Sequence, residues 1–145
     1  MATRYQITRW HEIDCGHRVY GHQGKCSRLH GHRYRFEMTC ELPARNQVLD
    51  DLGMVADFSV IKDGLCAWLD QAWDHRLLLW ERDPLAKLLL EHDHGVVLLA
   101  CNPTAENLAG RMVQTIGPMM LKHTDVSLVA CTVHETGKCS ATAFL

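Results

Sequence analysis

The first forty residues contain two segments in which apolar and polar side chains alternate, a pattern typical of half-buried β-strands. The alternation is clear over 32–40, whereas Arg9 and His11 interrupt it in the segment 5–17. One face of these segments carries the apolar side chains Tyr5, Ile7, Ile13, Cys15, Tyr34, Phe36, Met38 and Cys40. We therefore predict two successive strands, with His17 at the end of the first and on the same face.

Two later segments repeat apolar residues at steps of three and four, which is the spacing of an amphipathic helix. The first contains Phe58, Ile61, Leu65, Trp68 and Leu69, and the second contains Leu108, Met112, Ile116 and Met119. Asp57 and Thr104 stand just before these helices, and both are residue types that favour helix N-caps. Two helices are therefore predicted in the middle of the chain.

The C-terminal part returns to alternation at 126–136, where one face carries Val129, Cys131, Val133 and Glu135. Gly137 and Lys138 separate this predicted strand from the short segment 140–145, so we expect a β-hairpin. The order strand, strand, helix, helix, strand, strand predicts an α+β fold, with the helices on one face of an antiparallel sheet.

The stretch 80–101 has no single period. Residues 85–90 favour a helix, whereas 96–100 favour a short strand. Because the chain has 145 residues and contains no repeat, low-complexity run or linker, we predict one domain spanning 1–145.

The composition narrows the possible partners. Apolar residues make up 47% and charged residues 22%, as expected for a folded globular chain. The net charge is −2 and the Lys and Arg residues are scattered, which argues against nucleic acid or a membrane surface and favours a small molecule. Without a signal-peptide pattern or a membrane-length apolar run, we expect a cytoplasmic protein. Seven cysteines without a C-x-x-C pair argue against a disulfide framework there.

Ten histidines are the unusual feature of the composition, because imidazole is the commonest metal ligand. His30 and His32 share a strand face with Tyr34, and His17 can join them if the two strands pair antiparallel. Three histidines with an open fourth position are typical of catalytic zinc, whereas Cys26 as a fourth ligand would close the site. The spacing leaves both possibilities open. A second H-x-H, at 92–94, lies in a polar stretch and is expected in a solvated loop.

Two acidic positions have alternative interpretations. Glu135 is expected on the apolar face of its strand, where an unpaired carboxylate is costly. Either a cation or a ligand must therefore pair with it. Asp74 and His75, considered alone, are typical of a surface ion pair at the end of a helix. If a thiol needs a proton partner, however, a histidine oriented by a carboxylate is suited to a relay.

Several motifs occur in the order seen in the 6-pyruvoyl-tetrahydropterin synthase superfamily. They are His17-Arg18, "KCSRLHGH", "GMVADF" at 53–58, "DH" at 74–75, "NPTAEN" at 102–107 and "HET" at 134–136. The spacing C-x-x-x-H-G-H resembles the 6-carboxy-tetrahydropterin synthase branch of queuosine biosynthesis. One departure is Cys15-Gly16, where the family commonly has two alanines.

The resemblance implies a tunnelling fold: a four-stranded antiparallel sheet with two helices between strands 2 and 3, assembled through trimeric barrels into a homohexamer. It implies that His17, His30 and His32 hold Zn²⁺, and that Cys26 is the proton-abstracting base. Asp74 and His75 would complete a relay. Glu135 would bind the pterin ring, and Thr104 and Glu106 would line the pterin pocket.

The implied substrate is 7,8-dihydroneopterin triphosphate, and the implied products are 6-carboxy-5,6,7,8-tetrahydropterin, acetaldehyde and triphosphate. The nearest alternative is another pterin activity on the same scaffold, either pyruvoyl formation or side-chain cleavage of dihydroneopterin. An alternative of another class is a non-catalytic zinc-binding module in which Cys26 is a ligand.

Overall fold

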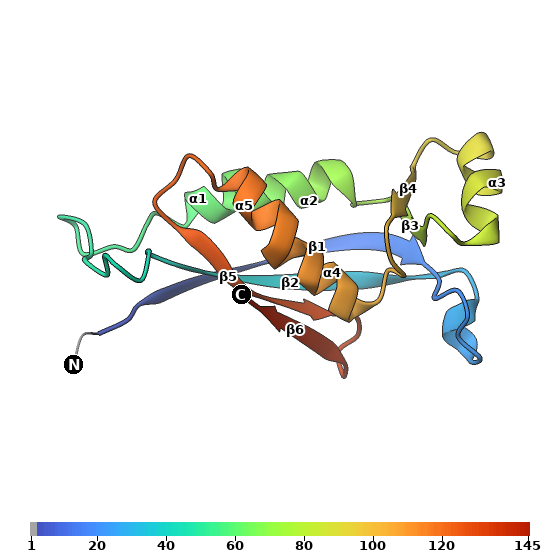
Figure 1. Ribbon diagram of the computed structural model, residues 1–145, viewed down its shortest axis with the longest axis horizontal. Coiled ribbons are helices and arrows are strands. Elements are labelled where there is room, and N and C mark those ends of the chain that lie inside the picture. The colour runs from blue at the N-terminus through green and yellow to red at the C-terminus, as the bar shows by residue number, and fades with distance from the viewer. Residues whose placement is uncertain (1–2) are drawn as a thin grey trace.

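The centre of the computed structural model, which describes residues 3–145, is a six-stranded sheet in the order β4-β3-β1-β2-β5-β6 (Figure 1). The strands are β1 (Gln6–His17), β2 (His30–Glu41), β3 (Leu77–Trp80), β4 (Val96–Leu99), β5 (Ser127–His134) and β6 (Ser140–Phe144). β1, β2, β5 and β6 pair antiparallel, whereas β3 pairs parallel with both β1 and β4. The fold is therefore α+β with a mixed sheet.

The two long strands β1 and β2 pair along their whole length, as the alternation predicts. Their register sets Cys15 opposite His32 and His17 opposite His30. Ile13, Cys15 and His17 are buried on one face of β1, and the alternate side chains are more exposed. Because side chains alternate across a strand, the register brings all three predicted zinc histidines to the same face at one end of the strand pair.

Two helical stretches cover this face of the sheet and lie side by side over it (Figure 1). The first consists of α1 (Ser59–Ile61), a π-helical segment (Lys62–Cys66) and α2 (Ala67–Ala72), and the second of α4 (Ala105–Arg111), a π-helical segment (Met112–Ile116) and α5 (Gly117–Met120). Their buried side chains include Ile61, Leu65, Leu69, Leu108, Met112 and Ile116, which confirms most of the predicted helical face. Phe58 and Met119, expected on that face, are instead 52% and 48% exposed because they lie at the ends of the two stretches.

The predicted caps of these helices are present. The Asp57 carboxylate accepts a hydrogen bond from the Ser59 backbone N–H at 2.8 Å. The Thr104 hydroxyl accepts one from the Asn107 backbone N–H at 3.2 Å. Each bond satisfies one of the backbone donors left free in a first helical turn. None of the helices within residues 3–145 combines the length and apolar character needed to cross a membrane.

The prediction of a four-stranded, wholly antiparallel sheet is wrong, because β3, α3 (Pro84–His92) and β4 add a parallel edge to it. This unit is inserted between the two helical stretches, which both lie between β2 and β5 in the chain order. β3 and β4 are four-residue apolar runs, and such short runs do not alternate clearly enough to be separated from buried helix by period. The helix and the strand suggested within 80–101 are both present.

The expected face of β5 also needs one correction. Leu128, rather than Val129, is buried with Cys131 and Val133. The pairing with β2 shifts between Thr39 and Cys40, so that one extra residue of β5 is accommodated there. A β-bulge of this kind turns the side chains that precede it to the opposite faces of the sheet. The side chains from Cys131 onward keep the predicted faces.

Candidate active site

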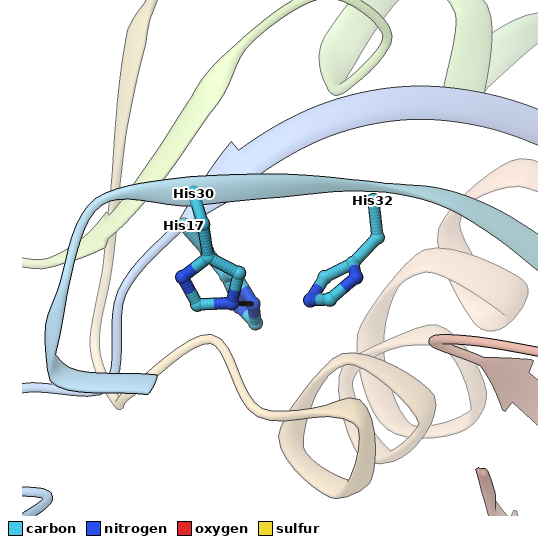
Figure 2. Close-up of side chains that lie close together, drawn as sticks. All are labelled: His17, His30 and His32. Atoms are coloured by element: carbon cyan, nitrogen blue, oxygen red, sulfur yellow. Dashed lines mark hydrogen bonds between the residues drawn. The ribbon is translucent and has the colours of Figure 1, made fainter. Parts of the chain in front are cut away.

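Three histidine side chains converge on the helix-covered face where β1 ends and β2 begins (Figure 2). Each of His17, His30 and His32 can offer one ring nitrogen to a group whose members lie within 4.8 Å of one another. Their ring centroids are separated by 4.5 to 5.1 Å. Within residues 3–145 this group contains no Cys26, so the geometry favours the three-histidine arrangement over the closed four-ligand one.

Backbone carbonyls orient two of the rings. His17 Nδ1 donates to the Pro103 oxygen at 2.7 Å, and His30 Nδ1 donates to the Arg28 oxygen at 2.6 Å. Because a carbonyl only accepts, each neutral ring keeps its proton on Nδ1 and presents a lone pair at Nε2. The two Nε2 atoms face each other at 3.0 Å. Two converging lone pairs repel each other unless a cation lies beside them, so this donor set fits a metal ion.

The third ring provides a second sign of a missing partner. His32 Nε2 is buried and has no hydrogen-bond partner among the described residues. The nearest acidic atom is Glu135 Oε1, at 3.4 Å. A buried polar atom without a partner is costly, and a metal ion at this point would satisfy it.

The local electrostatics also favour neutral imidazoles. Burial lowers the pKa of His17, although the hydrogen bond to Pro103 acts in the opposite direction. Burial likewise lowers the pKa of His32, opposed by the nearby Glu135 carboxylate. A neutral imidazole is the form that binds metal. At neutral pH, protons therefore compete little with a metal ion for these two rings.

A pocket of about 330 Å³ is lined by Cys26, Thr104, Glu106 and Glu135. These four residues come from the β1–β2 loop, the start of α4 and the end of β5, and all four are among those that the resemblance implicates. The pocket adjoins the histidines through Glu135, whose carboxylate approaches His32. A larger pocket, of about 640 Å³, is lined by residues of 42–60 and 123–126 and contains none of the predicted site residues.

Cys26 lies in a short 3₁₀ turn, Lys25–Ser27, and is partly exposed. Its thiol is free, as are all seven thiols of the chain. The β1–β2 loop that contains this turn is held at its start by Arg18, which forms a bidentate ion pair with the buried Asp83 carboxylate. A backbone bond from Val19 N–H to the Cys26 oxygen, at 2.7 Å, also restrains the turn.

Asp74 and His75 lie in a different place. His75 Nδ1 is 2.9 Å from Asp74 Oδ2, and the side chain of His75 is 77% exposed. His75 lines another pocket, of about 510 Å³, which His32 also lines but Cys26 and Glu135 do not. A single chain therefore unites the histidines, Cys26 and Glu135 but does not unite Asp74 and His75 with Cys26.

Some residues of the site have no signal in the sequence. The Pro103 carbonyl and the Tyr34 hydroxyl, which lies 3.1 Å from both ring nitrogens of His17, hold that ring. Tyr34 is visible in the sequence only as an apolar strand residue. His22 and Cys139 line the same pocket as Cys26, and nothing in their spacing indicates this.

Comparison with known proteins agrees with this geometry. The family model described as 6-pyruvoyl tetrahydropterin synthase matches residues 6–144. A 6-carboxy-5,6,7,8-tetrahydropterin synthase from Rickettsia bellii is 41% identical over 136 residues, covering 92% of this chain and 96% of the relative. A probable 6-carboxy-5,6,7,8-tetrahydropterin synthase from Halobacterium salinarum is 39% identical, covering 86% of this chain and 76% of the relative.

Solved structures support the fold. An uncharacterized protein from Wolinella succinogenes superposes with a TM-score of 0.83 at 20% identity, covering 99% of both chains. The Caenorhabditis elegans 6-pyruvoyl tetrahydropterin synthase gives a TM-score of 0.65 at 22% identity, covering 99% of this chain and 96% of that one. The site geometry, the family model and the curated relatives agree: the chain belongs to the 6-pyruvoyl tetrahydropterin synthase family, with 6-carboxy-5,6,7,8-tetrahydropterin synthases among its relatives, and it is a pterin side-chain lyase.

Proposed function

We propose that this enzyme is a zinc-dependent 6-carboxy-5,6,7,8-tetrahydropterin synthase of queuosine biosynthesis that works in the cytoplasm as a single-domain protein. Its proposed substrate is 7,8-dihydroneopterin triphosphate, and its products are 6-carboxy-5,6,7,8-tetrahydropterin, acetaldehyde and triphosphate. One observation carries the proposal: three converging histidines adjoin a pocket that is lined by a thiol and by a carboxylate. The curated relatives of that name supply the reaction.

Each side chain has a chemical task in this proposal. Zn²⁺ held by His17, His30 and His32 would supply a Lewis acid that stabilises negative charge on a substrate oxygen. Cys26 removes a proton from the side-chain carbon, because a thiol near a cation is a thiolate at neutral pH more readily than a free one. Its position in the pocket but outside the histidine group supports this role.

Glu135 binds the pterin ring by accepting from a ring N–H and from the exocyclic amine. A pair of charge-assisted hydrogen bonds of this kind is stronger than a neutral pair and excludes ligands that lack the two donors. Among the described residues no Lys or Arg forms an ion pair with Glu135, which supports the interpretation that a ligand is its partner. Thr104 and Glu106 complete the wall of this pocket.

Asp74 and His75 supply the proton relay to Cys26 from a neighbouring copy of the chain. The exposure of His75 and its separation from the Cys26 pocket support an intermolecular role. This arrangement requires a homo-oligomer, and the resemblance implies a hexamer of two trimers that closes the sheets into barrels.

The test is product identification. Zinc-loaded protein is incubated with 7,8-dihydroneopterin triphosphate, and the pterin product and acetaldehyde are identified by mass spectrometry. We expect 6-carboxy-5,6,7,8-tetrahydropterin together with acetaldehyde; a pyruvoyl pterin without acetaldehyde would contradict the proposal. Cys26→Ala is the matched variant: full zinc content with turnover lowered by about 100-fold or more supports the base, whereas lost zinc would identify Cys26 as a ligand.

A further inference from the structure

The loop between β1 and β2 must hold Cys26 at a fixed place relative to the histidines, although residues 20–25 are exposed. The chain reverses just after Tyr20: His22 N–H donates to the Val19 oxygen at 3.2 Å, and Gly21 has a φ of 92°, a conformation that favours glycine. An exposed turn of this kind has few packing contacts of its own, so polar contacts decide where it lies.

Asn102 makes two of these contacts from a point 82 residues further along the chain. Its Oδ1 accepts a hydrogen bond from the Tyr20 backbone N–H, and its Nδ2 donates to the Tyr20 backbone oxygen, both at 2.9 Å. One side-chain amide thus satisfies both polar groups of a single residue, in the way that a neighbouring strand would. Only a side chain with both a donor and an acceptor can do this.

The backbone of Asn102 is held independently of its side chain. Its carbonyl oxygen accepts hydrogen bonds from Asn107 Nδ2 and from the Thr104 N–H, both at 2.9 Å. The next residue, Pro103, orients His17, and Thr104 lines the Cys26 pocket. The backbone of this segment therefore supports the histidine side of the site, while the Asn102 amide reaches across to the loop.

We propose that Asn102 is a positioning residue whose side chain holds the Cys26 loop at the distance from the histidines that the reaction requires. The link runs from the Asn102 amide to Tyr20, and from the adjacent Val19 N–H to the Cys26 oxygen. This inference rests on the proposed role of Cys26 as the base. Without the amide, the start of the loop is still attached to other elements by the Arg18–Asp83 ion pair and by the Tyr20 ring, whose centroid lies 6.2 Å from that of Trp80, so the turn is held less tightly.

The test compares Asn102→Ala and Asn102→Asp with Gln47→Ala in the zinc-loaded protein. Gln47 is a matched control, because its side-chain amide also donates to two backbone oxygens, those of Leu42 and Pro43, but it lines neither pocket of predicted site residues. Alkylation of Cys26 by iodoacetamide is followed by peptide mass spectrometry, which separates it from Cys101 and Cys139. Zinc affinity, kcat and KM are measured on the same samples.

For Asn102→Ala we expect alkylation of Cys26 to be about tenfold faster, because two hydrogen bonds that hold the loop are lost. We expect kcat to fall about 100-fold with little change in KM, because displacement of a reacting group by about 1 Å has effects of that size. Zinc affinity remains that of the native protein, since the carbonyl contacts behind His17 involve backbone oxygens. Asn102→Asp keeps the acceptor for the Tyr20 N–H. Its Cys26 alkylation rate and its kcat should therefore lie between those of the native protein and those of Asn102→Ala.

The inference is overturned if both Asn102 variants leave Cys26 alkylation within about twofold of the native rate, or if Gln47→Ala accelerates it equally. If Asn102→Ala does not fold, Asn102→Asp against Gln47→Ala decides the same question. A native protein that forms no 6-carboxy-5,6,7,8-tetrahydropterin would refute the proposed function, whereas the alkylation and zinc measurements would still decide what Asn102 holds.

Discussion

The two places that contain the predicted metal-binding and catalytic histidines differ in how completely one chain builds them. His17 is 1% exposed, and a carbonyl and a hydroxyl hold its ring, whereas the side chain of His75 is 77% exposed. His75 is nevertheless fixed: its φ is 58°, its N–H donates to the Asp14 oxygen at 2.6 Å, and its ring contacts Asp74. A non-glycine residue with positive φ is strained and persists where the surroundings determine it.

The difference shows how a site built by one chain can be distinguished from a site that needs groups from a second chain. In the histidine cluster, backbone carbonyls of the same chain orient His17 and His30, and the three rings together could hold a metal ion. The Asp74–His75 pair is ordered but directed outward, with Asp74 accepting from the Asp14 N–H at 2.9 Å. An ordered acid–base pair whose histidine side chain is exposed is suited to acting on something outside its own chain.

The largest expected effect comes from removing a ligand of the complete site. His17→Ala should lower zinc affinity by at least about 100-fold and remove turnover with it, because two imidazoles bind zinc far more weakly than three. The measurement is zinc bound per chain after dialysis against a weak chelator. His94→Ala is the control, since His94 is exposed and lies outside the cluster. Native zinc affinity in His17→Ala would show that another group binds the ion.

The next effect tests the incomplete site. His75→Ala should lower turnover about 100-fold while leaving zinc affinity unchanged, because it removes a proton-transfer group and no ligand. Co-expression of His75→Ala with Cys26→Ala should restore activity, since a mixed oligomer then contains interfaces with both native residues. Two inactive proteins that stay inactive when mixed in one oligomer would contradict the shared site.

How far the sequence predicts these regions depends on what determines each position. Strand parity is a property of the local chain, so it correctly placed His17, His30 and His32 on one face and directed Glu135 toward the pocket. The same argument failed at Val129, because a bulge depends on the partner strand. β3 was not predicted, because a run of only four apolar residues has no clear period, whereas the strand suggested at 96–100 is β4.

The contacts that orient the site are harder to predict for another reason. The Pro103 oxygen and the Asn102 amide meet His17 and Tyr20 across 86 and 82 residues, and their partners are backbone atoms or ring nitrogens. Backbone groups are the same in every residue, so no residue type indicates which of them will be used. The motif "NPTAEN" indicated Thr104 and Glu106 as pocket residues but not the contacts of Asn102 and Pro103.

A third prediction concerns the inserted edge that supports the histidine cluster. Asp83→Asn should lower the free energy of unfolding by about 3 kcal/mol, because it leaves Arg18 without its buried partner while keeping an acceptor for the Leu85 N–H. Urea unfolding at pH 7 measures this. Asp51→Asn, in the exposed loop before α1, is the control and should leave the midpoint unchanged.

The same ion pair sets a pH dependence. Burial raises the pKa of Asp83, but hydrogen bonds from Arg18 and Leu85 and the charge of Arg18 together hold it below its ordinary value of 3.8. The pKa of Asp83 is lower in the folded than in the unfolded protein. The ion pair's contribution to stability is therefore full above the unfolded pKa and is lost as the pH falls through the folded pKa. The difference between native and Asp83→Asn stability should therefore shrink below about pH 4; a constant difference would contradict the ion-pair explanation.

The smallest effect separates the two groups that hold His17. Tyr34→Phe removes only the hydroxyl and keeps the ring, which packs edge-on against His17 at an interplanar angle of 87°. We expect a loss of about 1 kcal/mol in unfolding free energy, the typical net value of one hydrogen bond. Zinc affinity should change by less than about threefold, because the Pro103 oxygen still fixes the proton on Nδ1. A tenfold or larger loss of zinc affinity would mean that the hydroxyl, rather than the carbonyl, orients the ring.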